Sequence, residues 1–482
     1  MSSPPTIAGP DATERTAKDP GVAPAASAAD CAERNNATAA LQTLWRELDR
    51  AAVHCCTLPA RAAGRDGRAR IFDLLVARTD AAAAEAAALL SGLCRLRPPG
   101  GAGAPGHAEF LVLDAADDGL VRLVLWYTLP LRRDEPFYGQ LPWESALLGQ
   151  RRHCAVCGTW HLDHAHTALL AVAWDRASLP RAAANGDYAP AARELLGAAV
   201  TAADATAAVQ RRLRPHRCLG VARRVALHLT GWRSMRAGPD RRVPANGGLC
   251  IAFVGCDGAG KSTVTARFAA WLSPWLCIER SYLGSGDGSC SWLRWPLLRL
   301  HRLATRRRQP GQAAAPAGMP ASNPIARGPR RVLRDLLRPL WALLLALEKR
   351  QKLRRVWRAR AAGVVVICDR YPQNEIAGYN DGPLLTAWES SANPLRRALA
   401  RWERRPYEWA HLHPPDLVVK LLVGSPVAAA RKPDMSTTEI ERRIAAVATL
   451  AFGRRTPVLS VDAEAPLDTV VRTVRRGVFA RL

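Results

Sequence analysis

Hydrophobic and polar positions follow two distinct patterns along the second half of this sequence. Near-continuous apolar runs predict buried strands at 249–254, 276–282, 363–368, 416–423 and 458–461. Apolar residues at helical spacing predict helices between them at 263–272, 339–362, 426–431, 438–452 and 466–479. Buried strands that alternate with helices specify an α/β fold with a parallel sheet flanked by helices.

The first half has a more mixed pattern. Helical spacing predicts helices at 39–52, 81–96, 167–174 and 191–213, and shorter runs predict strands at 69–76, 109–113 and 120–127. The last two strands are joined by Asp-Asp-Gly, which is typical of a turn. We therefore expect an N-terminal α+β domain.

Composition shifts along the chain suggest the domain boundaries. Residues 1–37 are rich in Ala, Pro, Ser and Asp and are predicted to be a disordered tail. An N-terminal domain over 38–236 then precedes a linker at 237–246, where Gly, Pro and Asn gather. The second domain covers 247–482 and contains an Arg-, Pro- and Ala-rich insertion near 306–330, which we expect to be loosely ordered.

Composition also bears on the protein class and compartment. Hydrophobic residues make up 48% of the 482 residues, enough for sizeable cores. No apolar run approaches the roughly 20 residues needed to span a bilayer. The twelve cysteines show no disulfide-framework spacing, and the first residues lack the pattern of an export signal. We therefore expect a cytoplasmic enzyme.

Positive charge is the second marked feature of the composition. Lys and Arg total 68 against 42 Asp and Glu, a net charge of +26. Residues 291–360 hold 18 Lys and Arg but only Asp335 and Glu348 as acids. Such an excess indicates anionic partners. Nucleic acid or an acidic membrane surface is left open, but neither is favoured because no recognisable nucleic-acid module accompanies the charge.

A phosphate-binding motif carries the strongest functional signal. Gly255-Cys-Asp-Gly-Ala-Gly-Lys-Ser-Thr263 fits G-x-x-x-x-G-K-[ST] and lies between a predicted strand and a predicted helix. Its glycines let backbone N–H groups turn towards an anion, Lys261 reaches phosphates, and Ser262 suits Mg²⁺. The motif predicts that ATP and Mg²⁺ are the cofactors. The residues expected to hold ATP are Gly255, Asp257, Gly258, Gly260, Lys261, Ser262 and Thr263.

The second half resembles the thymidylate kinase-like P-loop nucleoside monophosphate kinases. After the phosphate loop, Ile367-Cys-Asp-Arg-Tyr371 is similar to that family's D-R-Y motif. The elements 378–382 (Gly-Tyr-Asn-Asp-Gly) and 415–422 look like the short aromatic-plus-glycine element and the strand before the lid helix. The resemblance covers about half the chain and implies a P-loop kinase fold.

The resemblance also implies roles for single residues. Asp369 would join Ser262 in holding Mg²⁺, and Arg370 would clamp the acceptor phosphate. The loop carries Gly258 and Ala259 where some members have an arginine, so the lid is expected to supply the catalytic cation. The lid candidates are Arg431, Lys432, Arg442 and Arg443, and we select Arg431. Lys261, Asp369, Arg370 and Arg431 are thus the expected catalytic residues.

The acceptor site departs from the family pattern. Thymidylate kinases carry Arg-Glu-Pro-Gly after their second strand, whereas this chain has Glu279-Arg-Ser-Tyr-Leu-Gly at that point. Arg280 is a substitute for the missing arginine, and Arg280, Arg370 and Tyr379 are the expected substrate contacts. We predict phosphoryl transfer from ATP to a phosphate-bearing acceptor, dTMP or a related nucleoside monophosphate. The alternative is a non-catalytic ATP-binding switch or scaffold whose basic region binds an anionic partner; a homodimer is left open.

Two features of the first half suggest other chemistry. Residues 70–76 faintly resemble the metal-binding strand of nucleotidyltransferases, but Ile71 stands where the first carboxylate belongs, so Asp73 is expected to be structural and the domain inactive.

Cys154-Ala-Val-Cys157 with His161 and later histidines has half of a zinc-site spacing. The intervals are too short for a usual zinc finger, and buried small cysteines explain the spacing equally well.

Overall fold

A computed structural model describes parts of both halves of the chain. The described residues are 39–59, 70–99, 106–130, 140–154, 158–174, 189–196, 241–284, 329–377, 381–433, 435–453 and 456–482. The predicted disordered tail, residues 306–328 of the basic insertion and Tyr379 lie outside these residues.

The second half folds around a five-stranded parallel sheet. Its order is β12-β13-β11-β14-β15, in which the first strand of the sequence lies in the centre. The strands are β11 (Cys250–Gly255), β12 (Ile278–Tyr282), β13 (Val365–Asp369), β14 (Leu417–Leu422) and β15 (Val458–Asp462). All five predicted strands of this half are confirmed to within a few residues, and the near-continuous hydrophobicity of the three central strands β13, β11 and β14 reflects burial on both faces.

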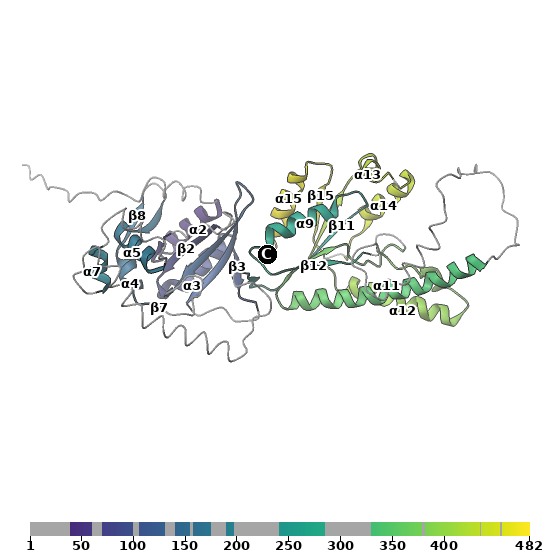
Figure 1. The fold of residues 1–482 in the computed structure, drawn as a ribbon, viewed down its shortest axis with the longest axis horizontal. Coiled ribbons are helices and arrows are strands. Elements are labelled where there is room, and N and C mark those ends of the chain that lie inside the picture. Colours follow the sequence, from purple (N-terminus) through teal and green to yellow (C-terminus); the bar gives the residue numbers. More distant parts are fainter. Residues whose placement is uncertain are drawn as a thin grey trace, which may run out of the picture.

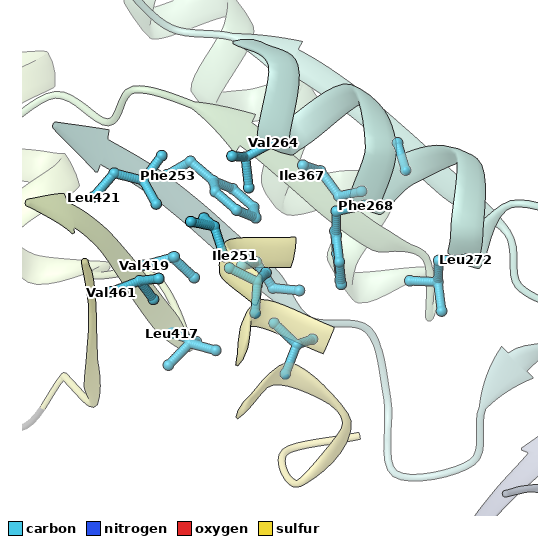
Figure 2. Close-up of a cluster of buried hydrophobic side chains, with 14 of the residues drawn as sticks. Ile251, Phe253, Val264, Phe268, Leu272, Ile367, Leu417, Val419, Leu421 and Val461 are labelled. Carbon is cyan, nitrogen blue, oxygen red and sulfur yellow. The ribbon is translucent and has the colours of Figure 1, made fainter. Parts of the chain in front are cut away.

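Helices cover both faces of this sheet (Figure 1). The helices α9 (Lys261–Leu272) and α15 (Leu467–Phe479) bury their apolar faces against one side of the sheet. On that side the ring centroids of Phe253 on β11 and Phe268 on α9 lie 5.8 Å apart. Figure 2 shows these side chains interleaved between α9 and the strands. The other side is covered by α11 (Pro329–Ala361) and α12 (Pro394–Leu412), while α13 (Ser425–Arg431) and α14 (Thr437–Thr449) follow β14.

The first half contains a separate, mixed sheet of eight strands. Its order is β10-β3-β4-β5-β2-β1-β9-β8, with parallel pairing of β2 with β5 and of β1 with β9. The strands are β1 (Cys55–Thr57), β2 (Arg70–Val76), β3 (Cys94–Arg97), β4 (His107–Leu113), β5 (Leu120–Trp126), β8 (Arg151–Cys154), β9 (Thr159–Leu162) and β10 (Val243–Pro244). A two-stranded sheet pairs β6 (Leu129–Pro130) with β7 (Gln140–Leu141).

Helices pack around the eight-stranded sheet. They are α2 (Ala39–Arg50), α3 (Ala81–Leu90), α4 (Glu144–Gly149), α5 (His164–Trp174) and α7 (Ala189–Leu196). The helix predicted at 81–96 is too long, because Gly92 adopts a φ of 76° after α3 and the chain turns into strand β3. The helix expected from 339 begins ten residues earlier, at Pro329, and keeps Pro339 inside it.

The two sheets meet at the end of the helix that follows the phosphate loop. Leu272 on α9 and the nearby Trp275 share a buried cluster with Leu96 and Leu120 of the first half. The Trp271 Nε1 group donates to the Asp118 carbonyl at 2.8 Å. Part of the expected linker joins the same contact, since β10 forms the edge strand of the eight-stranded sheet and pairs with β3. The structure therefore links the phosphate-loop helix directly to the N-terminal sheet.

Within the described ranges, the structure contains no helix that combines the length and apolar character needed to cross a membrane.

Candidate functional site

The phosphate loop lies at the carboxyl end of β11, the point from which the chain connections run to opposite sides of the sheet. Strand β11 has β13 on one side and β14 on the other, so its exit is the switch point of the strand order. Gly258 and Gly260 have φ values of 89° and 79°, which residues with a Cβ rarely adopt. They turn the loop into the first residues of α9, where unpaired N–H groups favour an anion.

Lys261 folds back onto its own loop. Its Nζ donates to the carbonyls of Gly255 at 2.9 Å and Cys256 at 2.7 Å, and the residue is only 7% exposed. Burial, reinforced by the nearby Arg370 charge, lowers the pKa of Lys261 from 10.5 to about 8 despite the opposing charges of Asp257 and Asp369. The nearby carboxylates thus do not fully stabilise the positive charge of the ammonium group, and an added anion such as a phosphate would stabilise it further.

Ser262 and Asp369 are brought together across the sheet edge. The Ser262 Oγ, at the start of α9, donates to Asp369 Oδ2 at the end of β13 over 3.2 Å. The second carboxylate oxygen, Oδ1, is buried and has no hydrogen-bond partner among the described residues. Hydroxyl and carboxylate oxygens are ligands that Mg²⁺ accepts, and an unpaired buried oxygen fits such an ion.

Asp257 in the loop is held between two arginines from different elements. The Arg370 Nη2 group donates to it at 2.5 Å, and Arg443 on α14 pairs with its other oxygen. Burial opposes ionisation, but the charges of Arg370, Lys261 and Arg443 together lower the pKa of Asp257. Arg370 reaches this position with a φ of 66°, a strained backbone for a residue with a side chain.

The charge network extends to two residues that sequence reasoning missed as site residues. Asp381 approaches Arg370 at 3.5 Å and Lys349 of α11 at 3.6 Å. Lys349 is 2% exposed and donates to the Leu283 carbonyl at 3.0 Å, and burial lowers its pKa. An Asp-Gly pair alone predicts only a turn, and a lysine within a basic helix gives no sign of burial. The network is therefore Arg443–Asp257–Arg370–Asp381–Lys349.

The lid cations divide according to their positions. The Arg431 Nη1 group donates to the Gly258 carbonyl at 3.2 Å and to the Ala463 carbonyl at 3.3 Å, so it lies against the phosphate loop. Arg443 contacts the loop through Asp257, whereas Lys432 and Arg442 are exposed. The structure thus brings Arg431 and Arg443 to the site and leaves the other two candidates at the surface.

The expected acceptor contacts are less complete. Arg280 is exposed on β12, and its side chain makes no hydrogen bond or ion pair among the described residues. Its role stays a prediction. The other described residues near the loop's acceptor side are Tyr282 and Gly284: a Cβ on Gly284 would lie 2.5 Å from Arg370 Cδ and from the Tyr282 ring. This close packing fixes the direction in which the Arg370 side chain leaves β13.

The first half keeps its polar residues in structural contacts. Asp73 is buried on β2 and accepts a hydrogen bond from Trp126 Nε1 at 2.8 Å. The two ring nitrogens of His161 lie 2.6 Å from the Thr57 hydroxyl and 2.7 Å from the Thr159 hydroxyl. No group of three or more metal-ligating side chains occurs among the residues that the structure describes, and Cys157 lies outside them.

No family model matches the chain, but it is similar to curated proteins of Escherichia coli. The uncharacterized ATP-binding protein YghR of Escherichia coli strain K12 is 31% identical over 235 residues, which are 47% of this chain and 86% of that protein. The uncharacterized ATP-binding protein YghS of the same strain is 29% identical over 235 residues, or 48% of this chain and 93% of that protein.

Proposed function

The chain belongs to the family of the Escherichia coli ATP-binding protein YghR, and we propose that it binds ATP and transfers a phosphoryl group to a phosphate-bearing acceptor. One observation carries the proposal: loop, hydroxyl, carboxylate and arginines converge at the carboxyl end of β11. Phosphoryl transfer needs positioned positive charge rather than a covalent nucleophile on the protein. Ser262, Asp369, Arg370 and Arg443 supply that arrangement.

The loop residues account for binding of the donor. The N–H groups at the start of α9 face the phosphates, and Lys261 exchanges its two carbonyl contacts for phosphate oxygens. Ser262 Oγ and the unpaired Oδ1 of Asp369 would hold Mg²⁺. When bound, that ion neutralises charge on the phosphate oxygens.

The arginines account for the transfer step. Arg370 leaves its pairing with Asp257 to hold the acceptor phosphate. Arg431 and Arg443 stabilise the negative charge on the phosphoryl group in the transition state of the transfer. An oxygen of the acceptor phosphate bonds to the γ-phosphorus while the bond from that phosphorus to the β–γ bridging oxygen breaks, which releases ADP. The acceptor oxygen is already ionised at neutral pH, so no general base is required. A thymidylate-like monophosphate is the proposed acceptor class.

Turnover by the purified full chain tests the proposal. ADP release is measured with Mg²⁺ and ATP against a panel of nucleoside monophosphates, with Lys261→Ala as the inactive control. We expect one acceptor to stimulate ADP release and Asp369→Asn to reduce it. Tight ATP binding that no acceptor converts into turnover would reject the kinase and favour the non-catalytic switch.

Two adjacent arginines on α14 provide a matched comparison. Arg443→Ala removes the cation that contacts the loop through Asp257, whereas Arg442→Ala removes an equal charge from the exposed surface. We expect the first to lower kcat by about 10²- to 10³-fold, in the range found for removal of a transition-state donor, and the second to change it less than about twofold. Equal effects of both substitutions would contradict the assignment of Arg443.

A further inference from the structure

A second concave surface lies between α11 and α12, on a face that the phosphate loop does not use. The groove has a volume of about 420 Å³, within the range of ligand sites. Its lining combines apolar, indole and guanidinium groups from Ala346, Arg350, Leu353, Arg354, Trp402, Arg405, Pro406 and Trp409. In contrast, Lys349 and Lys352 of α11 donate to the carbonyls of Leu283 and Tyr282, towards the site already described.

The groove arginines carry charge that nearby carboxylates do not balance. Within the described part of the chain, Arg350, Arg354 and Arg405 form no ion pair and are exposed. Neighbouring arginines behave differently: Arg404 pairs with Glu389 at 2.8 Å, and Arg360 pairs with Asp416 at 2.6 Å. The lining therefore favours an anionic ligand, for which guanidinium groups are well shaped.

The two indoles give the groove a flat aromatic side. Trp402 and Trp409 are seven residues apart on α12 and so lie on one helix face. Trp409 stacks on His413 with ring centroids 4.1 Å apart, while Trp402 has no ring partner among the residues that the structure describes. A half-buried indole that lines a groove can stack on a planar base, and base–aromatic stacking beside arginines is typical of single-strand binding.

We propose that this groove binds single-stranded nucleic acid, with a base on Trp402 and backbone phosphates on Arg350, Arg354 and Arg405. The positive track is longer than one nucleotide, since exposed Arg358 and Arg401 continue it by one turn on each helix. A second copy of the chain is a poorer occupant, because two arginine-lined faces would repel each other. The chain's net charge of +26 agrees with a polyanionic partner.

Fluorescence anisotropy with a labelled 12-nucleotide single strand tests this proposal on the full chain. Saturating ATP and Mg²⁺ are present so that the phosphate loop is occupied. We expect Trp402→Ala to weaken binding by about 5- to 150-fold, the range for loss of one stacked base, and Trp402→Phe to weaken it less. Thermal unfolding of each variant confirms that it is folded.

The arginines are tested independently of the indole. Arg350→Ala with Arg354→Ala should lower the slope of log affinity against log salt by about 1.4, since each phosphate contact on a single strand contributes about 0.7. Arg481→Ala, an exposed arginine on another face, is the control and should leave the slope and affinity within error.

Three results would overturn the proposal. Equal weakening by the Arg481→Ala control would show binding to diffuse surface charge rather than to the groove. Weaker strand binding with saturating ATP than without ATP would place the strand at the phosphate loop. Sedimentation that shows a dimer in the parent chain and a monomer in Trp402→Ala, with strand binding unchanged, would show that a second copy covers the groove.

Discussion

Replacement of Lys261 by methionine measures how much the buried charge of Lys261 destabilises the phosphate loop when no ligand is bound. The parent lysine is 7% exposed, and burial together with the Arg370 charge lowers its pKa from 10.5 to about 8. Methionine keeps the apolar stem but removes the ionisable group. The pH dependence of the difference in stability between the two proteins therefore reports the lysine alone.

The sign and size of this dependence follow from linkage. Between pH 8 and 10.5 the unfolded chain holds its Lys261 proton while the folded chain has lost it, so the free energy of unfolding of the parent rises with pH. The interval from 10.5 to about 8 corresponds to about 3 kcal/mol. The parent should thus gain about 3 kcal/mol over Lys261→Met between pH 7 and pH 11.

Urea unfolding of both proteins at pH 7, 8, 9, 10 and 11 in phosphate-free buffer measures this gain. Other groups titrate in both proteins and cancel in the difference. Added ATP supplies the missing anion, raises the lysine pKa and should shrink the pH-dependent gain of the parent. A difference between the two proteins that stays flat from pH 7 to pH 11 would refute the reasoning that Lys261 is held in an unfavourable charged state.

Three further changes test the contacts that hold the molecule together. Glu109, buried beside His107 and Arg242, has a pKa lowered to about 2, so Glu109→Gln should lower the free energy of unfolding at pH 7 by about 3 kcal/mol. That deficit should vanish as the pH falls from about 4.5 to 2, and its persistence at pH 2 would argue against the charge pairing. Asp118 pairs with two arginines of α15 at 2.7 and 2.8 Å. Asp118→Asn should lower the free energy of unfolding by about 1–3 kcal/mol, measured by thermal unfolding, and Asn also tolerates the φ of 54° at this position. A normal melting temperature would show that this contact contributes nothing. Gly248→Ala would place a Cβ 2.3 Å from the Arg360 carbonyl, so we expect loss of at least about 2 kcal/mol by urea unfolding, and a neutral result would show that the backbone there can shift.

Local pattern was sufficient for the parallel sheet and for the donor side of the site. The apolar runs predicted the three central strands β13, β11 and β14 because strands buried on both faces have few polar positions. The loop from Gly255 to Thr263 could be placed because its glycines, lysine and hydroxyl act through neighbours in sequence. Asp369 and Arg370 were selected because the segment from Ile367 to Tyr371 resembles the D-R-Y motif of the thymidylate kinase-like family.

Pattern was insufficient where helix propensity competed with a turn. The alanine-rich segment after Asp80 was predicted to be helical to residue 96, yet the helix ends before Gly92 and β3 follows, because pairing of β3 with β4 and β10 outweighs the local preference. No periodicity in the sequence could have shown that choice.

The sequence by itself determined that a strand, a phosphate loop and a helix occur in succession and that acidic and basic residues follow the third strand of the second half. Only the tertiary structure decided which distant charges meet there. Arg443 pairs with Asp257 from 186 residues away while its neighbour Arg442 faces outward, and Lys349 is buried beside Asp381. Backbone geometry and hydrogen bonding act over a few residues, whereas burial and charge pairing depend on which elements the strand order brings side by side.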